Sequence, residues 1–162
     1  MTAPGVDALC STHPNRSSLT ELDISGIGVT AETLEIICMH CGNIEVLRMG
    51  FIEYMEATLK QTLLPLVPQL RSLHVHWNSC ITDAFLLWVA KNLPRLEDLN
   101  VYGCAAVSVD GVSDLLFDRQ EAIKTNRPGM WSAIEKINVR YTSITKQDIE
   151  ALQATFERTK IV

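Results

Sequence analysis

Two histidines in one short β-rich run are the residues best suited to metal chemistry. One residue separates His74 from His76. Because side chains alternate along a strand, both imidazoles should lie on the same face. Asp98, in the next run of the same type, could supply a third ligand. Zinc normally requires four protein ligands, or three and a water. We therefore expect a polar binding surface here and no metal site.

A second candidate is Cys38-x-x-Cys41, with His40 between the two cysteines. This is half of a zinc-binding pattern, but no second pair of Cys or His follows at a suitable spacing. Both cysteines fit the apolar face of an expected helix, where a free thiol behaves as a small apolar group. The sequence has no phosphate-cradling glycine motif, nucleophile elbow or His-Glu-x-x-His. We therefore expect no catalytic residues and no cofactor, so the chain is not predicted to be an enzyme.

The elements that position these residues follow a repeated apolar pattern. Five runs carry apolar residues at their first, fourth and sixth positions, and they begin at residues 19, 44, 70, 96 and 134. The steps are 25, 26, 26 and 38 residues, and three of them lie in the range of about 20–29 residues of leucine-rich repeats. The runs are Leu19-Leu22-Ile24-Ile27, Ile44-Leu47-Met49-Ile52, Leu70-Leu73-Val75-Asn78, Leu96-Leu99-Val101-Cys104 and Ile134-Ile137-Val139-Thr142.

This periodicity predicts an α/β leucine-rich-repeat solenoid, a right-handed β-α superhelix of about five repeats with a parallel sheet on its concave side. The alternative is a doubly wound α/β sheet, in which strands also alternate with helices. Residues 1–18 are expected to form a flexible arm, and residues 19–162 the repeat domain. The last long step requires an insertion at about 117–133, with a turn signal at 126–129. Helix N-caps are expected at Thr30, Thr82, Ser108 and Thr145, and a sixth strand begins at Lys160.

Composition limits the class of protein further. A chain of 162 residues with 47% apolar content can form one domain with a substantial core. The net charge is −5 and Lys and Arg form no cluster, which argues against nucleic-acid binding. No apolar stretch is long enough to span a membrane. Five cysteines without a disulfide-type spacing favour a reducing, intracellular compartment. The absence of a secretory signal agrees with this, so the cytoplasm is favoured and mitochondria are the alternative.

The fourth run, from Leu96 through Cys104 to Leu115, resembles the cysteine-containing leucine-rich repeat of the ribonuclease-inhibitor-like superfamily. Ile81-Thr82-Asp83 and Cys41-Gly-Asn-Ile44 are similar to further elements of that pattern. Such repeats are best known from F-box substrate receptors of ubiquitin ligases, and the 18 residues before the first repeat are too few for an F-box. The resemblance also extends to short mitochondrial members similar to ATP synthase subunit s. It implies binding to other proteins.

Two surfaces are candidates for binding a partner. On the concave face, the third, fifth and seventh residues of each strand point away from the core. Tyr and Arg are enriched among interface hot spots. Aromatic residues also stand at the eighth position, where the loops begin, although these could instead pack on neighbouring loops. The concave candidates are Arg48, His74, His76, Asp98, Asn100, Tyr102, Asn138 and Arg140, and the loop-edge candidates are Phe51, Trp77 and Tyr141.

The helix at residues 84–90 is apolar on every side, so Leu87 and Trp88 are expected to face outward. Either the insertion at 117–133 or a partner protein could cover them. Together these features predict a non-catalytic protein-protein interaction module, an adaptor or a structural subunit of a multi-subunit assembly. The alternatives are the substrate-recognition component of a ubiquitin ligase, and a mitochondrial or ciliary complex subunit or assembly factor.

Overall fold

The structure is a computed structural model, and it describes residues 18–51, 56–125 and 130–162. The flexible arm predicted for residues 1–18 lies outside the described residues, apart from Ser18. The turn predicted at 126–129 and the apolar Ile52 of the second run also lie outside them.

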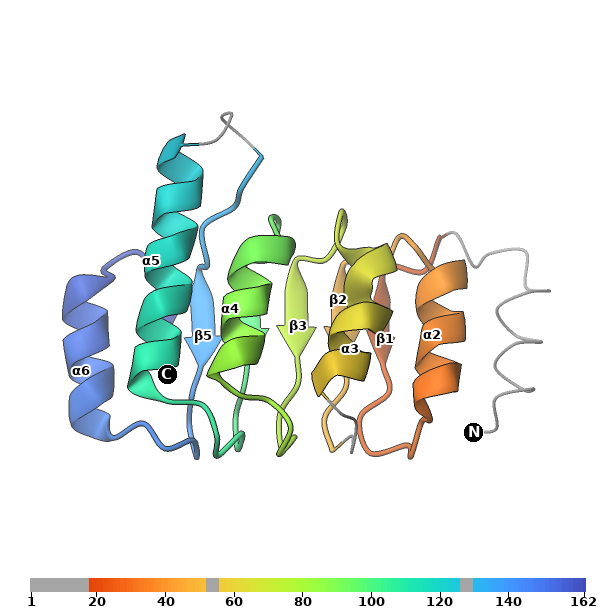
Figure 1. The fold of residues 1–162 in the computed structure, drawn as a ribbon, viewed down its shortest axis with the longest axis horizontal. Coiled ribbons are helices and arrows are strands. Elements are labelled where there is room, and N and C mark those ends of the chain that lie inside the picture. Colours follow the sequence, from red (N-terminus) through yellow and green to blue (C-terminus); the bar gives the residue numbers. More distant parts are fainter. Residues whose placement is uncertain (1–17, 52–55, 126–129) are drawn as a thin grey trace.

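The described residues form one six-stranded parallel sheet whose strands follow the order of the chain (Figure 1). The strands are short because each run of the repeat supplies only a few extended residues. A doubly wound sheet reverses its strand order at a switch point, and this sheet does not. The strands are β1 (Glu21–Asp23), β2 (Val46–Arg48), β3 (Ser72–His74), β4 (Asp98–Asn100), β5 (Lys136–Asn138) and β6 (Lys160–Ile161).

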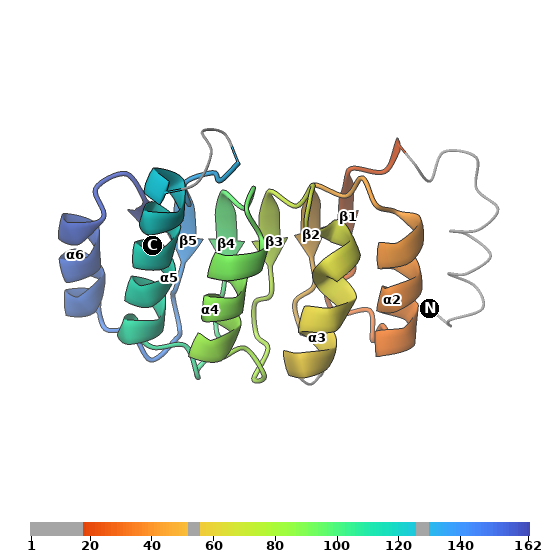
Figure 2. The same ribbon diagram turned by 45° about the horizontal axis from the view of Figure 1, so that its top comes forward.

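Helices connect successive strands and all lie on one face of the sheet, so the other face is left open (Figures 1 and 2). This one-sided α/β arrangement is compatible with a solenoid-like fold. We call the face of the sheet away from the helices the open face. The helices of the described residues are α2 (Ala31–His40), α3 (Glu56–Leu63), the 3₁₀ helix η2 (Leu64–Leu66), α4 (Asp83–Asn92), α5 (Val109–Thr125) and α6 (Lys146–Thr155).

The strand register confirms the alignment of the five runs. Leu47, Leu73, Leu99 and Ile137 stand opposite one another in neighbouring strands, and each is fully buried. Leu22 of β1 pairs with Leu47 in the same register. The sixth strand predicted at Lys160 is also present, since Lys160 pairs with Lys136. A one-residue slip would expose the whole apolar set, which is why the pattern fixes the register.

Three of the four predicted caps are confirmed as hydrogen bonds. The Thr30 hydroxyl accepts from the Thr33 amide at 3.2 Å, and the Ser108 hydroxyl from Gly111 at 3.2 Å. Thr145 forms a reciprocal capping box with Asp148. Thr82 occupies the N-cap position of α4, but its side chain makes no cap bond and donates instead to Glu56 on α3. The hydroxyl therefore links two helices at the N-terminus of α4.

The long step between the fourth and fifth runs is largely helical. Residues 117–125 of the predicted insertion are the last turns of α5, which at 17 residues is the longest described helix. Two contacts join α5 to α4. Asp83 accepts hydrogen bonds from the Ser108 amide and hydroxyl at 2.8 and 2.6 Å. Arg119, which is 1% exposed, donates to carbonyls at the C-terminal end of α4.

No helix in the described ranges combines the length and apolarity that crossing a membrane requires.

Candidate functional site

The candidate concave residues all lie on the open face, in rows set by the register. Arg48, His74, Asn100 and Asn138 occupy one row, and Asp98 stands beside Ser72 and Lys136 in another. Arg48 forms an ion pair with Glu21 of β1. Asn100 and Asn138 each accept a hydrogen bond from a backbone amide two residues later, at Tyr102 and Arg140. Much of this row is therefore engaged within the protein.

Ser72, His74 and Asp98 form a small polar cluster in the middle of the open face. His74 Nε2 lies 3.2 Å from Ser72 Oγ and 3.3 Å from Asp98 Oδ2. A catalytic relay uses different ring nitrogens for the hydroxyl and the carboxylate, whereas here one nitrogen contacts both. The hydrogen bond from His74 lowers the pKa of Asp98, and Lys136, 3.7 Å away, lowers it further. The cluster is a hydrogen-bond network, with an ion pair from Lys136 to Asp98, that is suited to holding these side chains in place.

His76 packs closely against the backbone at Gly50. A Cβ on Gly50 would lie 2.0 Å from His76 Nε2, so the ring occupies the space that a larger residue would fill. Burial lowers the pKa of His76, and the nearby charge of His74 lowers it further. Both effects favour the neutral form of the His76 ring. Among the described residues, no group of three or more His, Cys, Asp or Glu side chains is arranged to hold a metal.

The eighth position of every run adopts a left-handed backbone. The φ angles are 68° at Gly26, 59° at Phe51, 55° at Trp77, 72° at Gly103 and 58° at Tyr141. Glycine adopts this conformation freely. For other residues it costs about 1–2 kcal/mol, and a bulky residue there is an outlier. Three large aromatic residues thus stand where the backbone favours glycine.

These aromatic residues form one continuous surface with two neighbours from the open face. We call Phe51, His76, Trp77, Tyr102 and Tyr141 the aromatic edge. The rings of Phe51 and Trp77 are stacked at 6.2 Å, and those of Trp77 and Tyr141 are 6.3 Å apart. Tyr102 contacts both Trp77 and Tyr141, at 5.4 and 5.0 Å, and Phe51 contacts His76 at 5.6 Å. The structure therefore brings the loop-edge candidates together with two concave candidates.

Gly103 makes this continuity possible. A Cβ at Gly103 would lie 2.5 Å from Cδ2 of Trp77, so the indole lies directly over the glycine. The fourth run has no aromatic at its eighth position, and Trp77 spans the gap to reach Tyr141. Despite these contacts, Phe51, Trp77 and Tyr141 remain 59%, 45% and 70% exposed. Exposed aromatic residues at strained positions are typical of functional surfaces.

The strain can be tested at Tyr141, the most exposed of the three. We expect Tyr141→Gly to be more stable than Tyr141→Ala by about 1 kcal/mol, because only glycine relieves the left-handed backbone. The same pair at Glu150, an exposed position in α6, should show the opposite order by a similar amount. Urea unfolding followed by circular dichroism measures both differences. Equal stability of the two Tyr141 variants would contradict the strain.

The convex candidates lie on α4, outside the aromatic edge. Leu87 is 38% exposed. Trp88 is half-buried, packs against the core and stacks on Phe85 at 5.9 Å. Leu87 is thus the more exposed of the two. Helix α5, which carries the first part of the predicted insertion, packs against α4.

The cysteine pair lies in the core, as the sequence predicts. Cys38 and Cys41 are buried as free thiols. Burial raises the pKa of Cys38 to about 12, with a smaller contribution from Cys41. Burial likewise raises the pKa of Cys104 to about 11, and its thiol donates to the carbonyl of Val75 at 3.2 Å. Thiols in this state are poor nucleophiles and poor metal ligands.

We therefore expect Cys38 and Cys104 to resist alkylation in the folded protein. At pH 8, iodoacetamide should modify them about 100-fold more slowly than in urea, because few thiolates form and the side chains are covered. Timed labelling and mass spectrometry of the peptides would measure the rates. The half-buried Cys80 is an internal comparison and should react faster. Rapid labelling of Cys38 without denaturant would contradict the assignment.

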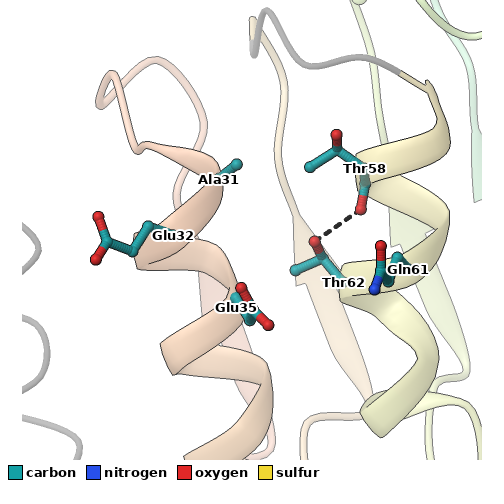
Figure 3. Close-up of a pocket in the computed structure, with 6 residues that line it drawn as sticks. All are labelled: Ala31, Glu32, Glu35, Thr58, Gln61 and Thr62. Atoms are coloured by element: carbon teal, nitrogen blue, oxygen red, sulfur yellow. Dashed lines mark hydrogen bonds between the residues drawn. The ribbon is translucent and has the colours of Figure 1, made fainter.

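A shallow groove lies on the helical side of the protein. Figure 3 shows it between α2 and α3, lined by Ala31, Glu32 and Glu35 of α2 and by Thr58, Gln61 and Thr62 of α3. The Thr62 hydroxyl donates to the Thr58 carbonyl at 2.7 Å. Glu32, Glu35 and Gln61 are exposed, so the groove is open and largely polar. Ligand sites usually have an apolar lining with a few convergent polar groups, and this groove does not.

Sequence reasoning identified the aromatic residues but missed the backbone conformation that they share. The signal was present in the sequence, because Gly26 and Gly103 occupy the same eighth position as the aromatic residues. A comparison of the chain with known proteins finds no matching family model and no matching curated protein. The chemistry of the aromatic edge is therefore the main guide to function.

Proposed function

We propose that this chain is a leucine-rich-repeat module that binds other proteins without catalysing a reaction, as an adaptor or structural subunit of a larger complex. The exposed aromatic edge is the observation that carries the proposal. Three aromatic side chains stand at positions where glycine would be less strained, and all three are substantially exposed. A surface that costs stability without filling the core is best explained by binding. Trp, Tyr and Arg are the residues that dominate protein interfaces.

Burial of the aromatic edge by a partner would also be energetically favourable. An aromatic side chain can bury about 150–250 Å², and apolar burial contributes about 25 cal/mol per Å². Trp77 and Tyr102 also carry polar groups that can bond to a partner at the rim. The Ser72–His74–Asp98 cluster lies on the same open face and would present a preorganised polar surface next to these rings. Preorganised side chains reduce the entropy cost of association.

Cross-linking mass spectrometry in the native cell tests the proposal, because lysines lie on both sides of the protein. Lys136 and Lys160 are exposed on the strands, whereas Lys91 and Lys124 are exposed on the helices. Cross-links to a partner are expected at the two strand lysines. The Trp77→Ala/Tyr141→Ala double variant should lose these partners, and Leu87→Ala on the helical side should retain them. A chain that cross-links to no other protein would overturn the proposal.

A further inference from the structure

The aromatic edge has features that define the chemistry of its partner beyond the fact of protein binding. Within the described residues, the Trp77 indole N–H and the Tyr102 and Tyr141 hydroxyls make no hydrogen bond. Three polar groups therefore stand among apolar rings and are free to bond to a ligand. A partner must offer acceptors to them while covering the rings.

An extended backbone meets this requirement better than a helix does. In an extended segment the backbone carbonyls are unpaired and can accept from these donors. In an α-helix the backbone groups are already bonded within the helix. The indole N–H and the two tyrosine hydroxyls would then rely on side chains of the partner alone.

The spacing of the rings also favours an extended partner. Successive rings along the edge, Phe51, Trp77 and Tyr141, are 6.2 and 6.3 Å apart. On one face of a strand, side chains recur about every 6.6 Å. In a polyproline II helix the repeat is about 9.3 Å. In an α-helix, side chains four residues apart are separated by a rise of about 6.0 Å, but each such step also turns by about 40°. The third side chain of such a series would therefore point away from the row of rings.

Charge next to the aromatic edge completes the description. Arg140 is exposed and directly precedes Tyr141, and no carboxylate of the described residues lies within ion-pair distance of its guanidinium. By contrast, Arg48 is paired with Glu21 and Lys136 with Asp98. An exposed guanidinium beside a Tyr ring is suited to a carboxylate of a partner.

We propose that the aromatic edge binds an extended segment of another protein whose apolar side chains recur at every second residue, with an Asp or Glu where the segment passes Arg140. The inference rests on the proposed function and specifies its partner. The apolar side chains of the segment pack on Phe51, Trp77 and Tyr141. Its backbone carbonyls accept from the tyrosine hydroxyls and the indole.

Selection from a displayed library of random 12-residue peptides on the full chain tests this inference. The selected peptides should show apolar residues at alternate positions and at least one acidic residue. Fluorescence anisotropy of the synthesised peptides then measures affinity. Trp77→Ala should weaken binding at least about 10-fold, as at an interface hot spot. Arg140→Ala should weaken an acidic peptide about fivefold and leave its Gln-substituted analogue unchanged. Circular dichroism confirms that each variant is folded.

Arg95→Ala is the matched control for Arg140. Arg95 is an exposed arginine that precedes the N-terminal end of β4, whereas the residues of the aromatic edge follow the C-terminal ends of the strands, so its loss should not affect peptide binding. Selected peptides with helical or polyproline periodicity would overturn the inference. Peptides whose affinity does not change with Trp77→Ala and Arg140→Ala would also overturn it, as would a selection that enriches no peptide. In each case, cross-links from Lys136 or Lys160 to a partner would still support the proposed function, so the two failures can be distinguished.

Discussion

Replacement of Arg119 by alanine is expected to lower the free energy of unfolding by about 4 kcal/mol. Arg119 extends from α5 to the C-terminal end of α4 and is 1% exposed. Its Nη1 donates to the Pro94 carbonyl at 3.0 Å, and its Nη2 to the Leu93 carbonyl at 2.7 Å and the Val89 carbonyl at 3.4 Å. The alanine variant would leave three carbonyls without this donor and open a cavity between two helices.

The charge of Arg119 contributes to this stabilisation as well as its hydrogen bonds. Burial lowers the pKa of Arg119 to about 10, so the guanidinium stays protonated at neutral pH. The C-terminal end of a helix carries a partial negative charge that favours a cation. The guanidinium also lies 4.9 Å from the ring centroid of Trp131, where a desolvated cation–π contact stabilises further. A single side chain thus joins α4, α5 and the segment before β5.

Urea unfolding of three variants would measure this contribution. Arg119→Lys keeps the charge but loses the planar guanidinium, so we expect the free energy of unfolding to fall by about 2 kcal/mol. This variant can also be measured if the alanine variant does not fold. Arg95→Ala removes an exposed arginine that bonds weakly to Gln69 at 3.4 Å, and its stability should change by at most about 0.5 kcal/mol. A loss below about 1 kcal/mol for Arg119→Ala would contradict the structural role.

The regular part of the fold could be predicted from the sequence, because the repeated pattern determines which residues are neighbours across strands and which face of each strand is buried. Leu73 and Leu99 stand at equivalent positions of runs 26 residues apart, and they are paired across β3 and β4. An apolar residue at every second position determines which face is buried, and a constant step determines which residues are neighbours. The same alignment placed Trp77 at the loop edge and Tyr102 on the concave face beside it, and the structure shows these two rings in contact.

The irregular part could not be predicted, because the last step departs from the period. An arginine in an expected insertion suggests an exposed side chain, and only the continuation of α5 places Arg119 beneath the end of α4. Its partner Trp131 follows a break in the pattern, so no spacing connects the two residues. Thr82 illustrates a smaller case, because its hydroxyl has a tertiary partner, Glu56, that competes with the expected cap. Contacts between helices are set by tertiary packing rather than by local sequence.

Asn78→Leu is the second substitution expected to cause a large loss, about 3 kcal/mol of unfolding free energy. Asn78 is the polar ninth residue of its run and is 2% exposed. Its amide nitrogen donates to the Met49 carbonyl at 3.0 Å and to the Val75 carbonyl at 2.9 Å. These carbonyls belong to two successive runs, so the side chain ties neighbouring loops together. Leucine has a similar volume but cannot donate, and both carbonyls would lose this buried partner.

Thr142→Val provides the matched comparison at the ninth position of the fifth run. The Thr142 hydroxyl donates to Val139 at 2.6 Å and accepts from the Ile144 amide at 3.2 Å, but it is only half-buried and bonds within its own run. Its loss should cost about 1 kcal/mol, measured by urea unfolding. Equal losses of unfolding free energy in Asn78→Leu and Thr142→Val would show that the link between runs adds nothing to stability.

Asn78→Asp separates the hydrogen bonds from the packing, because the shape is retained while the donor becomes an acceptor. At neutral pH a carboxylate would face the Met49 and Val75 carbonyls, so we expect a loss larger than that of Asn78→Leu. Burial and these carbonyls should raise the folded-state pKa of the new carboxyl above its unfolded value of about 3.9. The deficit relative to the wild type should therefore be smallest below the unfolded pKa and grow as pH rises through the folded pKa. A deficit that is independent of pH between about 4 and 7 would mean that the carboxylate escapes to solvent, and would contradict a side chain held against these two carbonyls.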